Sequence, residues 1–330
     1  MPHFHVYGVG NALVDLEYEI PEKMLSELKV DKGLMTLIEE DRHHELLNKL
    51  SALESRPCGG GSAANTITAA AQLGSSAFYS CKVANDETGR YFLNDLTASG
   101  VLTNLRQDSL QSGHTGKCIV LVTPDAERSM NTFLGITREI SVAELDETAI
   151  ADSQYVYIEG YLVPEVNARA AAVKSREVAN AKQVKTSLTL SDANMVNFFK
   201  DGLLEIIGDG LDMIFSNEDE ARLMFNADSI EECVAGLKSV SRQFAMTRGA
   251  HGALVFDGET LHDVPASSVQ AIDTNGAGDI YAGAFLHGLT NGMNFRNCAE
   301  LAGHAATELV QQLGARLTNQ QMQEIKKRFA

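Results

Sequence analysis

Short apolar segments alternate with longer amphipathic segments along most of the chain. The longer segments repeat apolar side chains at the three- and four-residue spacing of a helix, whereas the short ones are continuous runs typical of buried strands. This alternation predicts an α/β fold in which helices flank a mostly parallel central sheet. The predicted strands are 4–9, 77–83, 155–158, 213–215 and 244–247, and the clearest predicted helices are 63–73 and 166–179.

Two segments, 15–38 and 113–133, interrupt the alternation. Within the second, the apolar run 118–122 and the run 128–133 flank Thr-Pro-Asp-Ala-Glu at 123–127, which is the pattern of a hairpin around a turn. We expect the two segments to form a small β lid inserted into one domain that covers residues 1–330. No repeat, low-complexity tract or long linker divides the chain.

The charge of the chain argues against one class of partner. Its 44 acidic and 27 basic residues give a formal net charge of -17, and no dense stripe of Lys and Arg offsets it. Such a surface repels polyanions, so we expect no nucleic acid partner. ATP is not excluded, because a few backbone N–H groups and Mg²⁺ make a locally positive pocket.

Cysteine usage and hydropathy indicate a cytoplasmic protein. The five cysteines are odd in number and form no Cys-x-x-Cys pair, so neither a disulfide framework nor a zinc site is indicated. The N-terminus lacks the pattern of a signal peptide, and no window approaches the length of a membrane span. We therefore expect reduced thiols and no membrane association.

The sequence Asp-Thr-Asn-Gly-Ala-Gly-Asp at 273–279 leads directly into a small, apolar predicted helix. Small residues at a helix start expose N–H groups, and the helix dipole adds positive potential, so a phosphate fits there. Asp279, in the first turn, would take a proton from a hydroxyl that attacks the γ-phosphorus, and the dipole would keep it ionised. Alternatively, Asp273 or Asn275 caps the helix and Asp279 complements its dipole.

A second cluster of small residues, at 58–65, contains three consecutive glycines and opens another predicted helix. We expect Gly60 and Gly61 to let the backbone approach a ligand closely, and Asn65 to hydrogen-bond to substrate hydroxyls. The alternative is a dinucleotide-binding fingerprint, because Gly59-x-Gly61-x-x-Ala64 satisfies that pattern. The segment before it, Arg-Pro-Cys at 56–58, is a poor end for the buried strand that this alternative requires. A Walker A sequence is absent from the chain.

Together the two glycine motifs resemble the signatures of the ribokinase-like (PfkB) carbohydrate and nucleoside kinase family. Two segments between them match further landmarks of the family: 217–220 resembles its Asn-x-x-Glu motif, and 247–252 resembles its Thr-x-Gly-x-x-Gly nucleotide loop. The resemblance covers essentially the whole chain. It implies a ribokinase-like fold, ATP as the phosphoryl donor and Mg²⁺ as a cofactor.

The resemblance also assigns roles in catalysis. Asp279 would be the general base, and the N–H groups of Gly276, Ala277 and Gly278 would stabilise the charge on the transferred phosphoryl group. Arg128 resembles the lid arginine that approaches this group when the lid closes. The alternative for Arg128 is a solvated charge on a hairpin.

Metal and nucleotide binding are implied in the same way. Asn217 and Glu220 would act on Mg²⁺ mainly through water, which suits a hydrated, octahedral ion. A monovalent cation such as K⁺ is common in the family, and Asp273 and Asn275 lie where its loop would be. The residues that match the family's nucleotide-binding positions are Asn217, Glu220, Thr247, Gly249, Gly252 and Asn275.

On the acceptor side, Asp15 resembles the aspartate that accepts hydrogen bonds from two vicinal sugar hydroxyls, with a turn aspartate as the alternative. Tyr161 would offer an aromatic face to a purine, with a core tyrosine as the alternative. The remaining residues implied in acceptor binding are Asn11, Gly60, Gly61 and Asn65.

Within the family, residues 8–15, 123–130 and 157–161 look closest to bacterial adenosine-kinase-like members. This implies transfer of the γ-phosphoryl group of ATP to the 5′-hydroxyl of adenosine, and a monomer rather than a homodimer. Three alternatives stay open at this point: a sugar kinase of the fructokinase or ribokinase type, a dinucleotide-dependent oxidoreductase, and a nucleotide-binding protein without catalysis.

Overall fold

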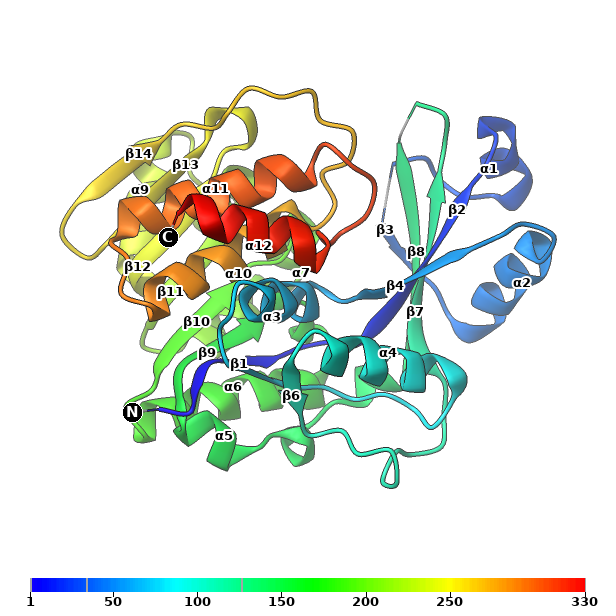
Figure 1. Cartoon of the computed structure of the whole chain (residues 1–330), viewed down its shortest axis with the longest axis horizontal. Helices are drawn as coiled ribbons and strands as arrows, with labels where there is room; N and C mark the ends of the chain where they lie inside the picture. Colours follow the sequence, from blue (N-terminus) through cyan, green and yellow to red (C-terminus); the bar gives the residue numbers. More distant parts are fainter. Residues whose placement is uncertain (1, 34, 126, 330) are drawn as a thin grey trace.

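Two β-sheets organise the chain, a large one in the main body and a small one that projects from it (Figure 1). The computed structural model describes residues 2–33, 35–125 and 127–329. Leu34 and Ala126, which fall inside the two segments predicted to form a lid, lie outside the described residues.

Nine described strands form the large sheet, in the order β14-β13-β12-β11-β10-β9-β1-β5-β6. The strands from β12 to β6 are parallel, and β13 and β14 add an antiparallel edge. Their bounds are β1 Phe4–Val9, β5 Ala77–Ser80, β6 Val101–Thr103, β9 Ser153–Glu159, β10 Lys185–Thr189, β11 Leu211–Asn217, β12 Ser241–Thr247, β13 Ala253–Phe256 and β14 Leu261–Val264. This is the mostly parallel sheet that the alternating pattern predicts.

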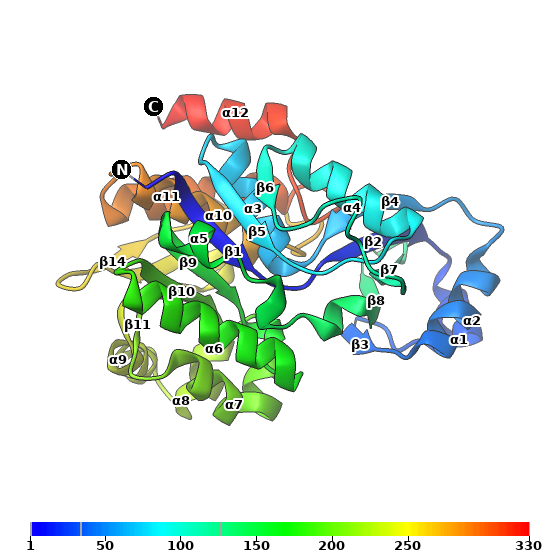
Figure 2. The same cartoon turned by 90° about the horizontal axis from the view of Figure 1, so that it is seen from below.

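Helices cover both faces of the large sheet, and each face has its own apolar core (Figure 2). One layer consists of α3 Ser62–Gln72, α4 Glu87–Ala98, α10 Ala277–Thr290, α11 Phe295–Leu309 and α12 Asn319–Arg328. The other consists of α5 Glu147–Ala151, α6 Val166–Ala181, α7 Ala193–Ile207, α8 Glu218–Phe225 and α9 Ile230–Val240. The predicted α/β architecture is therefore confirmed. No helix among the described residues is long and apolar enough to cross a membrane.

The small sheet has the strand order β3-β8-β7-β2-β4. Its strands are β2 Leu13–Glu19, β3 Met35–Leu37, β4 Arg56–Gly60, β7 Thr115–Val122 and β8 Arg128–Gly135. Helices α1 Glu22–Leu28 and α2 Glu40–Leu50 cover one face through a separate apolar cluster that includes Tyr18, Leu46 and Ile119. The hairpin predicted around 123–127 is confirmed by the antiparallel pairing of β7 with β8.

The ranges predicted from the sequence do not include β4, β6, β10, β13 or β14. β4 contains Pro57 and two glycines, which sequence patterns treat as strand breakers, but it is an edge strand that pairs only with β2, where a missing N–H is tolerated. β10 reads Lys-Thr-Ser-Leu-Thr and lacks an apolar run. Because β4 lies outside the segments 15–38 and 113–133, the small sheet uses more of the chain than these two segments.

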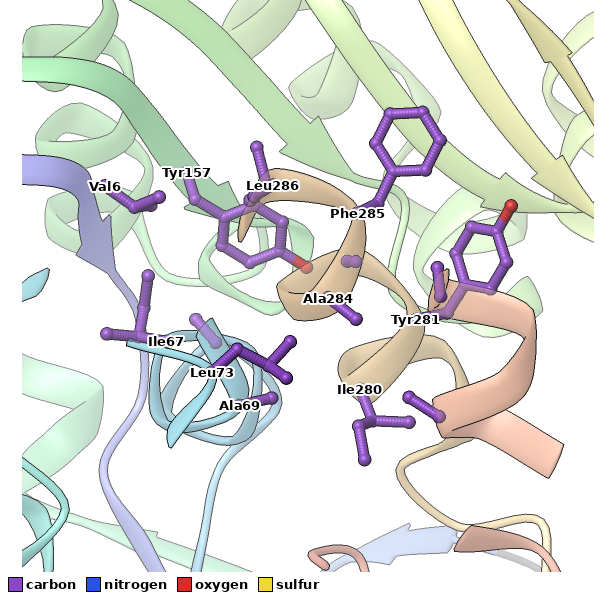
Figure 3. Packing of buried hydrophobic residues seen from close by; sticks show 14 of the residues in the cluster. Val6, Ile67, Ala69, Leu73, Tyr157, Ile280, Tyr281, Ala284, Phe285 and Leu286 are labelled. Carbon is purple, nitrogen blue, oxygen red and sulfur yellow. The ribbon is translucent and has the colours of Figure 1, made fainter. Parts of the chain in front are cut away.

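Helices α3 and α10 pack side by side against the large sheet, and small residues allow this close approach (Figure 3). A Cβ atom placed on Gly283 would lie 2.3 Å from the carbonyl oxygen of Thr66 and 2.8 Å from the Cβ of Ala69. The figure shows Ala69 on the side of α3 that faces Ile280 and Ala284 of α10, whereas Ile67 lies on the side toward Val6. This packing brings the N-terminal ends of the two helices together.

We predict that Gly283→Val destabilises the protein, because the added side chain forces α3 and α10 apart. Overpacking of this kind costs about 1–3 kcal/mol, and the midpoint of urea unfolding should fall accordingly. Gly303→Ala is the matched control, since no atom lies within 4 Å of the Cβ position of that helical glycine. Equal midpoints for Gly283→Val and the wild type would show that α3 and α10 are not in tight contact.

Candidate active site

The carboxylate of Asp279 connects the N-terminal ends of α3 and α10. The hydroxyl of Ser62 donates a hydrogen bond to its Oδ1 at 2.6 Å, and Nδ2 of Asn65 donates to its Oδ2 at 3.0 Å. Ser62 and Asn65 both belong to the first turn of α3, and Asp279 belongs to the first turn of α10. The two glycine motifs therefore meet at a single carboxylate.

Burial raises the pKa of Asp279 above its usual value, while the hydrogen bonds from Ser62 and Asn65 and the charge of Arg316 lower it. The sequence predicted only that the helix dipole keeps this carboxylate ionised. A raised pKa is suited to a general base, because a more basic carboxylate accepts a proton more readily.

Each of the three consecutive glycines makes room for a different group of the protein. A Cβ on Gly59 would lie 2.2 Å from Oδ2 of Asp95, one on Gly60 would lie 2.3 Å from Oδ1 of Asp15, and Gly61 has φ +94° beside the carbonyl of Asn11. The prediction was that these glycines admit a ligand. In the described chain the nearest groups are protein side chains and backbone, and close approach of a ligand stays a prediction.

The start of α10 offers unused N–H groups. The N–H of Ala277 donates to the carbonyl of Thr274 at 3.2 Å, but those of Gly276, Gly278 and Asp279 make no hydrogen bond within the described chain. The prediction for Ala277 is thus weakened, because its N–H closes the preceding turn. No atom lies within 4 Å of the Cβ position of Gly278, so this side of the helix start is open to a phosphate.

A cavity of about 470 Å³ adjoins the same helix start. Thr247, Gly249 and Gly252, predicted to bind a nucleotide, line it together with Ala277 and Gly278. Much of the remaining wall is apolar and comes from Val264, Pro265, Val269, Tyr281, Ala299, Ala306, Val310 and Phe329. A volume in the range of small-molecule sites and apolar walls suit a purine base.

Asn217 and Glu220 form a capping box at the start of α8. Each side chain accepts from the backbone N–H of the other residue: Oδ1 of Asn217 accepts from Glu220 at 2.8 Å, and the Glu220 carboxylate accepts from Asn217 at 3.0 Å. Nδ2 of Asn217 also donates to this carboxylate at 2.6 Å. Because Glu220 is buried and its oxygens already accept hydrogen bonds from Asn217, a role on Mg²⁺ through water fits better than direct ligation. No group of three or more His, Cys, Asp or Glu among the described residues is arranged to hold a metal. Asn217 pairs with Thr247 across β11 and β12, beside the cavity.

Asp15 lies on β2 and is not among the residues that line the cavity, but its charge interacts with that of Asp279. Its carboxylate has no hydrogen-bond partner within the described residues and sits over Gly60. Burial raises its pKa to about 7, Arg316 and Arg128 lower it, and Glu17 and Asp279 raise it. An unpartnered carboxylate in a cleft is suited to accept hydrogen bonds from a ligand.

Asn11 is held by a residue that the sequence did not single out, Glu159. The Asn11 side chain donates to Glu159 at 2.8 Å, and Glu159 also accepts from the N–H of Ala63 at 2.9 Å. Asn11 is 5% exposed and its side-chain NH₂ already donates to Glu159, so it supports the site and does not offer a free donor to substrate. Asn65 is likewise 6% exposed and is engaged by Asp279 and Arg316.

Tyr161 lies in the short helical turn that directly follows β9. Its hydroxyl donates to Oδ2 of Asp192 at 2.8 Å, which fixes the orientation of the ring. The side chain is partly buried against the apolar core on the face of the large sheet that α5 to α9 cover. Stacking of this ring on a purine stays a prediction.

Arg128 joins the small sheet to the loop before α10. Its Nη1 lies 2.8 Å from Glu17, and its Nη2 lies 2.9 Å from Oδ2 of Asp273. The expected position near a phosphoryl group therefore requires Arg128 to leave a buried ion pair. Asp273 also accepts hydrogen bonds from the N–H groups of Asn275 and Gly314, so its carboxylate is largely occupied and these contacts give no support to a cation bound directly by it.

Comparison with known proteins identifies the family. The profile of the pfkB family carbohydrate kinases matches residues 28–322. The chain belongs to this family. It is therefore a kinase, a phosphotransferase that acts on an alcohol group, and the dinucleotide-binding reading of 59–64 is wrong. The physical reason is that β4, which precedes this turn, is an antiparallel edge strand of the small sheet and not a parallel strand of the large one.

Relatives of this pfkB-family chain include nucleoside and sugar kinases. The adenosine kinase of Dictyostelium discoideum is 26% identical over 96% of this chain and 97% of that protein. The solved structure of adenosine kinase from Sinorhizobium meliloti has a TM-score of 0.90 and 33% identity, with 99% of both chains covered. That of a probable sugar kinase protein from Rhizobium etli CFN 42 has a TM-score of 0.90 and 32% identity, again with 99% of both chains covered.

Proposed function

We propose that this kinase transfers the γ-phosphoryl group of ATP to the 5′-hydroxyl of adenosine and releases ADP and AMP. The observation that carries the proposal is the position of Asp279. It hydrogen-bonds to the start of α3, and Ala277 and Gly278 of its own helical turn line the nucleotide-sized cavity. The unpartnered Asp15 is near enough for its charge to interact with that of Asp279. A hydroxyl bound next to Asp15 would thus reach the base at the place where a phosphate would meet α10.

The reaction follows from this geometry. ATP lies with its base in the cavity and its γ-phosphate at the start of α10, where the N–H groups of Gly276, Gly278 and Asp279 stabilise the charge of the transition state. Asp15 accepts hydrogen bonds from the ribose hydroxyls and orients the acceptor. Asp279 takes the proton of the 5′-hydroxyl as its oxygen attacks in line with the departing ADP.

Asn217 and Glu220 would hold Mg²⁺ through water, because the Glu220 carboxylate is buried within their capping box. When bound, the ion neutralises charge on the phosphates. K⁺ is not needed to balance Asp273, because Arg128 already pairs with it.

The small sheet acts as the lid of a single domain in this proposal, and excludes water that would compete as acceptor. The face of this sheet that carries Asp15, Glu17 and Arg128 also has an apolar part: Val120 and Met130 occupy it, and across the sheet Met35 pairs with Met130 and Leu37 with Thr132. Met35 and Met130 are partly exposed, and Leu37 is 52% exposed. Such a surface favours a nucleoside, whose base buries apolar area, over a free sugar.

A sugar acceptor is the second candidate, and the similarity to the probable sugar kinase protein favours it. The cytoplasmic location and the monomeric state expected from the sequence stay predictions.

An ADP-release assay with ATP and Mg²⁺ separates the two candidates. We predict that kcat/KM for adenosine exceeds those for inosine, ribose and fructose by roughly 100-fold, since the base supplies binding energy that a sugar lacks. Turnover with fructose or ribose in preference to adenosine would instead establish a sugar kinase.

Replacing the proposed base tests the mechanism. Asp279→Asn should lower kcat by about 10²–10⁴-fold, the usual contribution of general base catalysis, while the affinity for ATP stays close to that of the wild type. The control is Asp228→Asn, an exposed aspartate outside the site. An Asp279→Asn enzyme with nearly unchanged kcat would exclude this base.

The pKa of Asp15 gives a pH dependence. Because burial raises it to about 7, the carboxylate gains a proton below that pH and loses its capacity to accept from both hydroxyls. Calorimetry without ATP should therefore show adenosine binding that weakens roughly tenfold from pH 8 to pH 6. Asp15→Asn should bind more weakly, with an affinity that hardly changes over this range. A pH-independent affinity of the wild type would count against Asp15 as the diol acceptor.

A further inference from the structure

Arg316 lies in the segment between α11 and α12, and its side chain is 10% exposed. Its Nε donates to Oδ1 of Asn65 at 2.7 Å, and its Nη1 forms an ion pair with Oδ2 of Asp95 on α4 at 2.6 Å. Its Nη2 is buried and has no hydrogen-bond partner within the described chain. An arginine this deeply placed in the cleft is unlike the solvated arginines of the surface.

The backbone makes room for this contact at Gly59. A Cβ at that position would lie 2.2 Å from Oδ2 of Asp95 and 2.7 Å from Nη1 of Arg316. The ion pair therefore lies against Gly59 of β4, the strand that leads into α3. A side chain at the first of the three consecutive glycines would therefore collide with this ion pair.

The chemistry of the guanidinium fixes the orientation of Asn65. A guanidinium only donates hydrogen bonds, so the atom of Asn65 that faces it must be the oxygen. The NH₂ group of Asn65 then points the other way, where it donates to Oδ2 of Asp279. With the amide rotated by half a turn, oxygen would face the carboxylate and NH₂ would face the guanidinium, and both contacts would be repulsive.

Arg316 also supplies positive charge to a site rich in carboxylates. Its charge lowers the pKa of both Asp15 and Asp279. The ionisable groups that influence Asp279, or are influenced by it, are Arg316, Asp15, Glu159, Glu220, Tyr157 and Tyr161. Arg316 is the only cation in this set.

We propose that Arg316 is a positioning residue of the acceptor site: anchored by Asp95, it orients the Asn65 amide so that this amide holds the carboxylate of Asp279. The inference rests on the proposed role of Asp279 as the base. It adds a residue that touches neither reacting atom and belongs to none of the motifs.

The pH profile of kcat/KM tests the role. Replacing Arg316 by Met removes the charge and frees the Asn65 amide to rotate, so the pKa of Asp279 should rise and the acid limb should move upward by roughly 1 pH unit. The loss of kcat/KM should be largest at low pH and should narrow as the pH rises. Arg316→Lys, which keeps the charge, should shift the limb by less.

The pH profiles of two further variants, Asp95→Asn and Arg242→Gln, are compared with that of Arg316→Met. Asp95→Asn removes the anchor. Because it also removes a negative charge, which by itself lowers the pKa of Asp279, it should shift the limb upward by less than Arg316→Met does. Arg242, whose side chain is 84% exposed on β12, is the matched control and should leave the profile unchanged. Binding of a fluorescent ATP analogue reports whether each variant is folded.

Two results would overturn the proposal. One is an acid limb that is identical in the wild type and in a folded Arg316→Met variant. The other is a rise of the acceptor KM with no change in the pH profile, which would mean that Nη2 binds the acceptor directly. Loss of activity in Asp279→Asn together with either result would leave the proposed function intact and remove only the role of Arg316.

Discussion

The site depends on one buried carboxylate held between two helix N-termini. Asp279 can lie there because Ser62 and Asn65 donate to it, and because Gly283 lets α3 and α10 approach closely enough for those bonds to form. A carboxylate removed from water without such donors would be costly. The same contacts tie the start of α3, which follows the glycine beside Asp15, to the start of α10, which lines the cavity.

The location of the site follows from the topology of the large sheet. Ligands of open α/β sheets bind outside the carboxyl ends of the parallel strands, and Glu159, Asn217 and Thr247 all stand at such ends. Carboxylates gather there, and burial raises the pKa of Asp15, Glu159 and Glu220 to about 7 in each case. Few cations offset them, so Arg316 and Arg128 carry much of the electrostatic balance of the cleft.

Local patterns predicted the fold class and the main strands, because each of these depends on residues that are neighbours in the sequence. That the two glycine motifs act together came from the family resemblance, since Asn65 and Asp279 lie 214 positions apart. β4 and β10 were missed because Pro57 and the polar residues of β10 conceal strands whose pairing depends on the sheet. Arg316 escaped prediction for a different reason. It contacts Asn65 across 251 positions, and no motif marks it.

The account is tested most directly by a crystal structure of the enzyme with adenosine and a non-hydrolysable ATP analogue. It predicts the 5′-hydroxyl oxygen within about 2.6–3.2 Å of an Asp279 oxygen, the γ-phosphate on the N–H groups at the start of α10, and the adenine of the analogue in the cavity beside Thr247. A 5′-hydroxyl that points away from Asp279, with the phosphates bound elsewhere, would contradict it.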